Sequence, residues 1–420
     1  MGILKTINRR FDAEQPDSLV SCNRAVTVLS RDNGFTEEVL RCFAITPEKR
    51  KLPLTIGNAG TLLADIQSLD EQDLKIDIPV PLRNIDLVKV LPNDYALFHI
   101  YGIKDPELIK ALQADNLNVE SRYSARSDLL DYYSLSKFAS FLHDHKMGAY
   151  AKTILEHLHA NLEEQFTCSA RLLYHKEDAK YYLRAVTSEK GYKDYGINFS
   201  VLVALLAVDS YAKSKQDSVF IDSYSIDDSR VSLSFQFSRE IPLRDGMSLS
   251  LNLLLENDEI RQSSVSLNAI FKVKYGKDDR SLFLKPTAYQ KRDGEYSTDM
   301  LTYTHGMKVS TVHERISTLP LLIAKYVEQI RTNAAEILKI NNPQETKNYL
   351  LNKVQRSRKE EFRGYKASVI QKIISMEVNT VYDLFDLLRD VEELFGEDIK
   401  SRNYWRENLY NTLIEKGRRD

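Results

Sequence analysis

Residues 231–237 alternate strictly between apolar and polar side chains, and this pattern constrains the fold more than any other feature. Val231, Leu233, Phe235 and Phe237 are apolar, and serine or glutamine stands between them. Successive side chains of a β-strand point to opposite faces of a sheet, so the alternation predicts a strand with one apolar and one polar face. Such a strand fits an antiparallel sheet that is buried on one face and wet on the other.

Further strand-like runs precede and follow this one, and they are joined by connections too short to hold a crossover helix. They are residues 219–224, 247–255, 265–273 and 282–289. Short connections predict antiparallel pairing. From residue 310 onward apolar side chains recur at helical spacing, which predicts helices over residues 312–339, 343–375, 380–394 and 402–416. We therefore predict an α+β protein with an antiparallel β-sheet core, flanking helices and a C-terminal helical region.

The first half of the chain mixes both kinds of element. Strand-like runs are residues 25–29, 75–80, 85–91, 95–101, 171–174 and 181–186, the last two as a hairpin. Helices are expected over residues 61–69, 127–164 and 199–211, with Gly148 as a turn within the second. The predicted regions are 1–125 (N-terminal α+β), 126–165 (helical hairpin), 166–310 (antiparallel β-rich core) and 311–420 (C-terminal helices).

Composition narrows the classes of protein that this chain can belong to. It has 420 residues, 43% of them hydrophobic, so it can bury a sizeable core. Its formal net charge of −2 gives no overall field toward nucleic acid or membrane. Cys22, Cys42 and Cys168 lack metal-binding spacing and are expected to be reduced thiols. The apolar run at residues 201–208 is too short to span a bilayer, and the N-terminus lacks a signal-peptide pattern, so we expect a cytoplasmic protein without a membrane partner.

The strongest local signal is a basic segment at residues 347–372, which carries eight basic residues against Glu360 and Glu361. On one continuous helix, a single arc would hold Lys353, Arg356, Lys359, Arg363 and Lys366, with Tyr349 beside them. Basic side chains along a helix suit the phosphates of a nucleic-acid strand, and a tyrosine can stack on an unpaired base. The segment thus predicts a nucleic-acid-binding stripe.

An acidic neighbour offers a different explanation of the same charges. Residues 376–398 hold eight acidic residues and one arginine. The basic stripe can therefore be neutralised within the chain or simply be a solvated surface. The sequence leaves open whether the acidic segment masks the basic helix.

Patterns that would indicate catalysis are weak. His143, His145, His157 and His159 form two pairs, but only one residue of each pair can face the other, whereas zinc needs three or four ligands. Asn257, Asp258 and Glu259, with Asp245, could hold a divalent ion, but a turn between strands is the simpler interpretation. Neither a catalytic residue, nor a metal site, nor a cofactor is predicted, and the question of enzymatic activity stays open.

Several short motifs recur in the order of a known family. They include Glu240, Ile241 and Asp245, then Asn257, Glu259 and Ser264, preceded by Arg184, Ser188 and Asn198 and followed by the helix at residues 380–385. Together, over residues 183–395, they resemble the family known only as domain of unknown function 932. Arg244, Asp258, Arg261 and Ser263 depart from its pattern. Members occur in phages, plasmids and other mobile elements, so the resemblance implies an origin but not a reaction.

These observations lead to an ordered set of expectations. The first is a non-enzymatic accessory protein of a phage or mobile element that binds nucleic acid, with single-stranded nucleic acid as its partner. The second is a protein-binding inhibitor of a host defence system, with a host protein as its partner. A metal-dependent nuclease is the third. The C-terminal amphipathic helices can also serve as an interface in a homo-oligomer.

Overall fold

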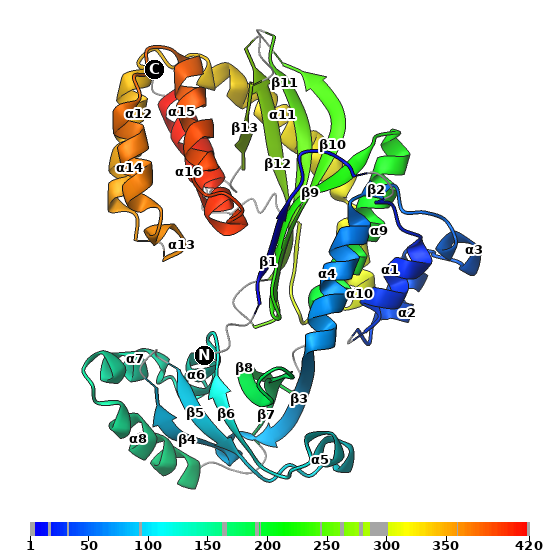
Figure 1. Cartoon of the computed structure of the whole chain (residues 1–420), viewed down its shortest axis with the longest axis vertical. Coiled ribbons are helices and arrows are strands. Elements are labelled where there is room, and N and C mark those ends of the chain that lie inside the picture. The colour runs from blue at the N-terminus through cyan, green and yellow to red at the C-terminus, as the bar shows by residue number, and fades with distance from the viewer. Residues whose placement is uncertain are drawn as a thin grey trace.

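The computed structural model describes the whole chain except residues 1–4, 16–17, 32, 92–94, 162–165, 190–192, 194, 244–245, 261–263, 277–279, 286–300, 359 and 418–420. Two β-sheets dominate it, and each packs against its own hydrophobic core (Figure 1). The predicted class, α+β with an antiparallel sheet and C-terminal helices, is confirmed.

The larger sheet has the strand order β1-β9-β10-β11-β12-β13, with β2 beside β9 and β14 beside β12. Its strands are β1 (Ile7–Arg10), β2 (Ile56–Gly57), β9 (Val219–Ile226), β10 (Arg230–Pro242), β11 (Ser248–Asp258), β12 (Val265–Tyr275), β13 (Arg280–Leu284) and β14 (Leu301–Tyr303). Neighbours from β9 to β13 pair antiparallel, which confirms the prediction from their short connections. The part of the fourth predicted run beyond Lys285 lies outside the described residues.

Helix α9 (Ile197–Lys215) covers the apolar face of this sheet, as the alternation in β10 requires. Leu233 and Phe235 are fully buried there. Helix α9 is long and apolar enough to cross a membrane by length and composition alone, but 78% of that stretch is buried inside the protein. Its apolar surface is thus used as core.

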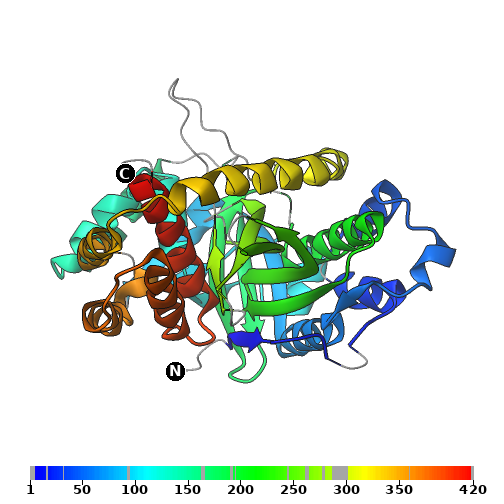
Figure 2. The same ribbon diagram turned by 90° about the horizontal axis from the view of Figure 1, so that it is seen from above.

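The polar face of the sheet differs from the sequence-based expectation, because it is covered instead of wet. Helices α15 (Val381–Glu393) and α16 (Ile399–Gly417) pack on the side opposite α9 (Figure 2). Ser232, Ser234 and Asn252 are consequently buried although they are polar. The sequence pattern fixed which side chains share a face, but not what lies over that face.

The smaller sheet is formed entirely by residues 73–188, in the order β3-β7-β8-β6-β5-β4. Its strands are β3 (Asp73–Pro81), β4 (Ile85–Val90), β5 (Ala96–Ile100), β6 (Leu117–Ser121), β7 (Thr167–His175) and β8 (Lys180–Ser188). Helices α5 (Pro106–Leu112), α6 (Ala125–Asp131), α7 (Ser136–Asp144) and α8 (Gly148–Ala160) accompany it. The β7–β8 hairpin forms as predicted, but it pairs with β3 and β6 and so belongs to a different sheet from β9–β13.

The N-terminal segment before β3 is helical where a strand was predicted. It contains α1 (Cys22–Leu29), α2 (Thr36–Cys42), α3 (Pro47–Arg50) and α4 (Ala59–Gln72). The prediction of a strand at residues 25–29 is wrong: Ser21 caps α1 by accepting a hydrogen bond from Arg24 N, and Cys22, Ala25, Val26 and Leu29 are buried on one helical face. A short apolar run fits both kinds of element, and here the cap decides.

The C-terminal helices are more broken than predicted. Residues 309–337 form α10 (Val309–Ile316) and α11 (Leu319–Ile337), while residues 343–375 form α12 (Pro343–Arg356), α13 (Glu360–Arg363) and α14 (Lys366–Ser375). Ser357 is extended and ends α12, so α12 and α14 pack side by side instead of forming one rod (Figure 1). In α16, Trp405 is fully buried and donates its indole N–H to Leu388 O at 3.0 Å.

A paired substitution in β10 tests which face of the larger sheet holds the core. Phe235→Ala is expected to lower the free energy of unfolding by about 3–5 kcal/mol, because it opens a cavity against α9. Gln236→Ala, the neighbour on the opposite face, is expected to cost less than about 1 kcal/mol. Urea unfolding followed by circular dichroism measures both. Equal losses would mean that the two faces do not differ as described.

Candidate functional site

The carboxylate of Glu259, just after β11, connects the two sheets. It is buried and accepts from Lys75 Nζ at 2.8 Å and from Arg184 Nη1 at 2.8 Å, and these two residues come from β3 and β8 of the smaller sheet. Arg171 of β7 donates to the backbone carbonyl of the same residue at 2.6 Å. The backbone N–H of Ile197, in the first turn of α9, completes the site at 2.7 Å.

The electrostatics of this cluster are mutually dependent. Burial alone would raise the pKa of Glu259, but Lys75, Arg184 and Arg171 outweigh it and hold the pKa well below its ordinary value. Conversely, Arg184 is fully buried, and Glu259 offsets the desolvation that would otherwise lower its pKa. The helix N-terminus adds a further partial positive charge beside the carboxylate.

The family-motif residues are structural parts of this joint. Arg184 and Glu259 form the ion pair, and Asn257 donates to Tyr195 O at 2.9 Å and to Ser200 Oγ at 2.7 Å. Asn198 donates to Arg31 O and Asp70 nearby. Ser188 is exposed at the end of β8, Ser264 is half-buried before β12, and Asp245 lies outside the described residues. Because cations and backbone N–H groups already occupy the Glu259 carboxylate, the motif gives no open acidic site for a metal ion.

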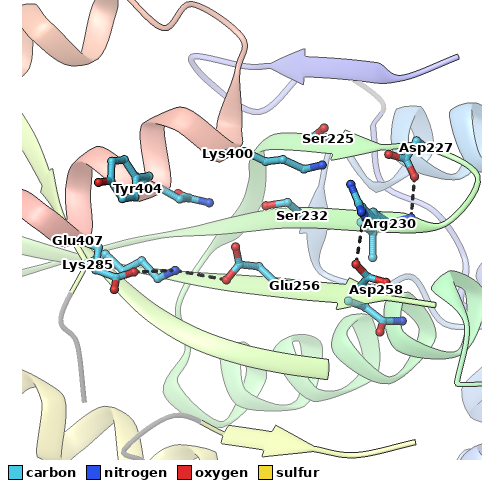
Figure 3. Close-up of a pocket in the computed structure, with 13 residues that line it drawn as sticks. Ser225, Asp227, Arg230, Ser232, Glu256, Asp258, Lys285, Lys400, Tyr404 and Glu407 are labelled. Carbon is cyan, nitrogen blue, oxygen red and sulfur yellow. Dashed lines mark hydrogen bonds and ion pairs between the residues drawn. The ribbon is translucent and has the colours of Figure 1, made fainter. Parts of the chain in front are cut away.

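A polar pocket of about 360 Å³ lies beside this joint, between the polar face of β9–β11 and the first turns of α16 (Figure 3). Its charged lining comprises the carboxylates Asp227, Glu256, Asp258 and Glu407 and the cations Arg230, Lys285 and Lys400. Lys285 lies between Glu256, at 3.3 Å, and Glu407, at 3.7 Å. Arg230 pairs with Asp258 at 3.1 Å. Burial and the adjacent Asp228 raise the pKa of Asp227.

Three buried atoms in the pocket lining have no hydrogen-bond partner among the described residues. They are Ser232 Oγ, Asn403 Nδ2 and Asn257 Oδ1. Ser232 is 5% exposed and Asn403 4% exposed. A buried polar group without a partner costs free energy, so these atoms require water or a ligand in the pocket.

The predicted basic stripe is dispersed in the structure. Lys366 donates to Gln355 O at 2.6 Å and to Ser357 O at 3.0 Å, so it caps the end of α12. Tyr349 holds the ammonium groups of Lys353 and Lys416 over its ring, with Nζ atoms 4.9 and 5.0 Å from the ring centroid. Lys359 lies outside the described residues. The one-helix arc is thus wrong, because α12 ends within it.

The acidic segment does not cover the predicted stripe residues that the structure describes. Asp386 contacts Tyr275 and Arg280, Glu392 binds Arg402 and Arg406, and Glu393 pairs with Arg10. The basic segment reaches this region through Lys372, which pairs with Asp390, and through Lys347, which donates to Met376 O. The acidic side chains therefore mostly stabilise the packing of α15 against α16 and the larger sheet.

Three arginines at the junction of α12 and α13 are exposed and form no hydrogen bond or ion pair within the described part of the chain. We call Arg356, Arg358 and Arg363 the arginine cluster. The cluster adjoins the polar pocket: Ser357 Oγ lies 2.8 Å from the hydroxyl of Tyr404, a lining residue, and the ring of Phe362 packs 5.5 Å from that of Tyr404. Sequence reasoning identified Arg356 and Arg363 but missed the pocket.

The histidine pairs hold structural contacts where the structure describes them. His145 Nδ1 bonds to Phe141 O at 2.8 Å, and His159 Nδ1 contacts Asp86 at 3.3 Å. Burial lowers the pKa of His159 despite that carboxylate. Among the described side chains, no group of three or more metal-ligating residues converges.

Comparison with other proteins gives no guide to this arrangement. No protein-family model matches the chain, and no curated protein or solved structure matches it significantly. The chemistry of the side chains themselves is then the guide to function.

Removing the charge of Glu259 tests its role as the joint between the sheets. Glu259→Gln is expected to lower the free energy of unfolding by about 3–5 kcal/mol, because it leaves buried cations without their counter-charge. Urea unfolding measures the loss. As a control, Glu37→Gln removes a partner of Arg50 whose side chain is 84% exposed, and should cost less than about 1 kcal/mol. Similar small losses in both variants would contradict the role assigned to Glu259.

The same carboxylate predicts a pH dependence of stability. Its pKa is lowered in the folded protein relative to the ordinary value of 4.5. Its contribution is therefore present above pH 4.5 and is lost as pH falls through the folded pKa. Melting temperature measured against pH should fall more steeply below that value in the wild type than in Glu259→Gln. Parallel curves would show that another group controls acid unfolding.

Proposed function

We propose that this chain is a non-enzymatic protein that binds single-stranded nucleic acid through the arginine cluster at the junction of α12 and α13. The observation that carries the proposal is the group of three exposed arginines without partners among the described residues. Arginine presents a planar fork of donors that matches the oxygens of a phosphate. Three such groups on one turn suit successive phosphates of a strand.

The surroundings of the cluster favour an unpaired strand over a duplex. The cations lie on one short turn, Arg356 to Arg363, instead of along a helix that could follow a groove. A flexible strand can bend around such a turn, whereas a stiff duplex meets it at few phosphates. Next to the turn lies a pocket with unsatisfied hydrogen-bonding groups, and only an unpaired strand offers free base edges.

The resemblance of Arg184, Asn198, Asn257 and Glu259 to a family carried by phages and plasmids supports a role as an accessory protein of a mobile element. These residues build the joint between the sheets, so the resemblance bears on origin and fold. The binding surface proposed here lies on different residues.

The salt dependence of binding tests the arginine cluster. Three phosphate contacts should give a slope of about −2 in a log–log plot of affinity against salt, at about −0.7 per contact for single strands. The triple variant Arg356→Glu, Arg358→Glu, Arg363→Glu should lose most of that slope with an unchanged melting temperature, because exposed charges contribute little to stability. Fluorescence anisotropy of a labelled oligonucleotide at several salt concentrations measures this.

A matched control separates a local site from a general charge effect. Arg24, Arg41 and Lys51 are also exposed, and they lie in and beside α1–α3, on the opposite side of the molecule from α12–α14 (Figures 1 and 2). Reversing these three to glutamate changes the net charge equally and should leave binding nearly intact. Equal losses in both triple variants would reject the site. If the wild type binds no strand even at low salt, the function is rejected and a protein partner, such as a host defence enzyme, becomes the leading candidate.

A further inference from the structure

We propose that the polar pocket beside the arginine cluster receives one unpaired nucleobase of the bound strand. This inference rests on the proposed function and specifies how the strand is held. The phosphates would lie on the exposed arginines, and one base would enter between β10, β11 and α16.

Position connects the two parts of the site. Tyr404 lines the pocket, and its hydroxyl contacts Ser357, the residue between Arg356 and Arg358. Phe362 packs against the same tyrosine and directly precedes Arg363. A strand whose phosphates contact the arginines therefore passes the Tyr404 end of the pocket, and a neighbouring base can turn inward.

The pocket has the size and hydrogen-bonding groups that a base requires. Its volume of about 360 Å³ lies within the range of small-molecule sites, roughly 300–1,000 Å³. Ser232 Oγ can donate or accept, Asn403 Nδ2 donates, and Asn257 Oδ1 accepts, and none of the three atoms has a partner among the described residues. The edge of a nucleobase carries both donors and acceptors, so it can satisfy groups that a purely apolar ligand would leave unpaired.

The charges of the pocket favour a neutral group over a phosphate. Asp258 is paired with Arg230, and Glu256 and Glu407 share Lys285. Asp227 accepts from the backbone N–H groups of Ser229 and Arg230 at 2.9 and 2.7 Å. Carboxylates thus already occupy the two buried cations, and a phosphate would meet negative walls. A base, neutral at pH 7, meets no such repulsion.

An abasic strand separates base insertion from phosphate contact. Anisotropy titrations would compare oligothymidylate with an abasic strand of equal length and charge, each at several salt concentrations. We expect the wild type to bind the abasic strand roughly tenfold more weakly, because a stacked and hydrogen-bonded base contributes to affinity, while the salt slope stays the same. Equal affinity for the two strands with a normal salt slope would overturn the base pocket and leave the arginine cluster standing. No salt-dependent binding of either strand would overturn both.

Filling the pocket locates the effect. Asn403→Leu replaces the unpartnered amide with an apolar group of similar size, and should reduce the difference between the two strands to less than about twofold. Asn408→Leu is the matched control, because Asn408 lies on the same helix but does not line the pocket, and it should keep the full difference. If Asn403→Leu fails to fold, Ser232→Val fills the pocket from β10 and carries the same expectation. A folded pocket variant that keeps the wild-type difference would overturn the inference.

Discussion

A single buried negative charge holds the two halves of this fold in register. Glu259 ends a strand of the larger sheet, while Lys75, Arg184 and Arg171 come from three strands of the smaller one. Neither side can be buried alone, because an unpaired charge in the interior costs several kcal/mol. The first turn of α9 is tied to the same carboxylate, so the main core helix, both sheets and the position of the adjacent polar pocket depend on one side chain.

The larger sheet is unusual in that both of its faces are covered but only one is apolar. On the α9 side, the core residues of β10 and β11 pack as in any two-layer fold. On the other side, α15 and α16 lie over serines and asparagines, and a second buried carboxylate, Glu392, is held there by Arg402 and Arg406. Helices do not fill a polar surface as closely as an apolar one, and the pocket is the space that remains. Its unsatisfied groups are a product of that mismatch.

The sequence predicted what depends on local periodicity and missed what depends on distant partners. The strands β9 to β13 follow from alternation and short connections, whereas the assignment of β7 and β8 to the other sheet depends on pairing with residues far earlier in the chain. The break after Arg356 has no proline or glycine to announce it. Lys366 and Tyr349 were expected to be free because the carbonyl of Gln355 and the ammonium of Lys416 cannot be placed near them from spacing alone. The pocket joins residues 225–258 to residues 400–407, so no local motif could reveal it.

The cover formed by α15 and α16 is attached unequally along its two edges. At the β12–β13 edge the contact is aromatic and apolar, with the ring of Phe385 5.2 Å from that of Tyr275. Toward β9–β11 the helices rest on polar side chains and the pocket. Separation at the polar edge exposes hydroxyls and amides that water solvates readily, whereas separation at the other edge exposes hydrocarbon. The helices can therefore lift on the pocket side while they stay hinged at β13, and the interior between sheet and helices is open to solvent exchange without loss of either core.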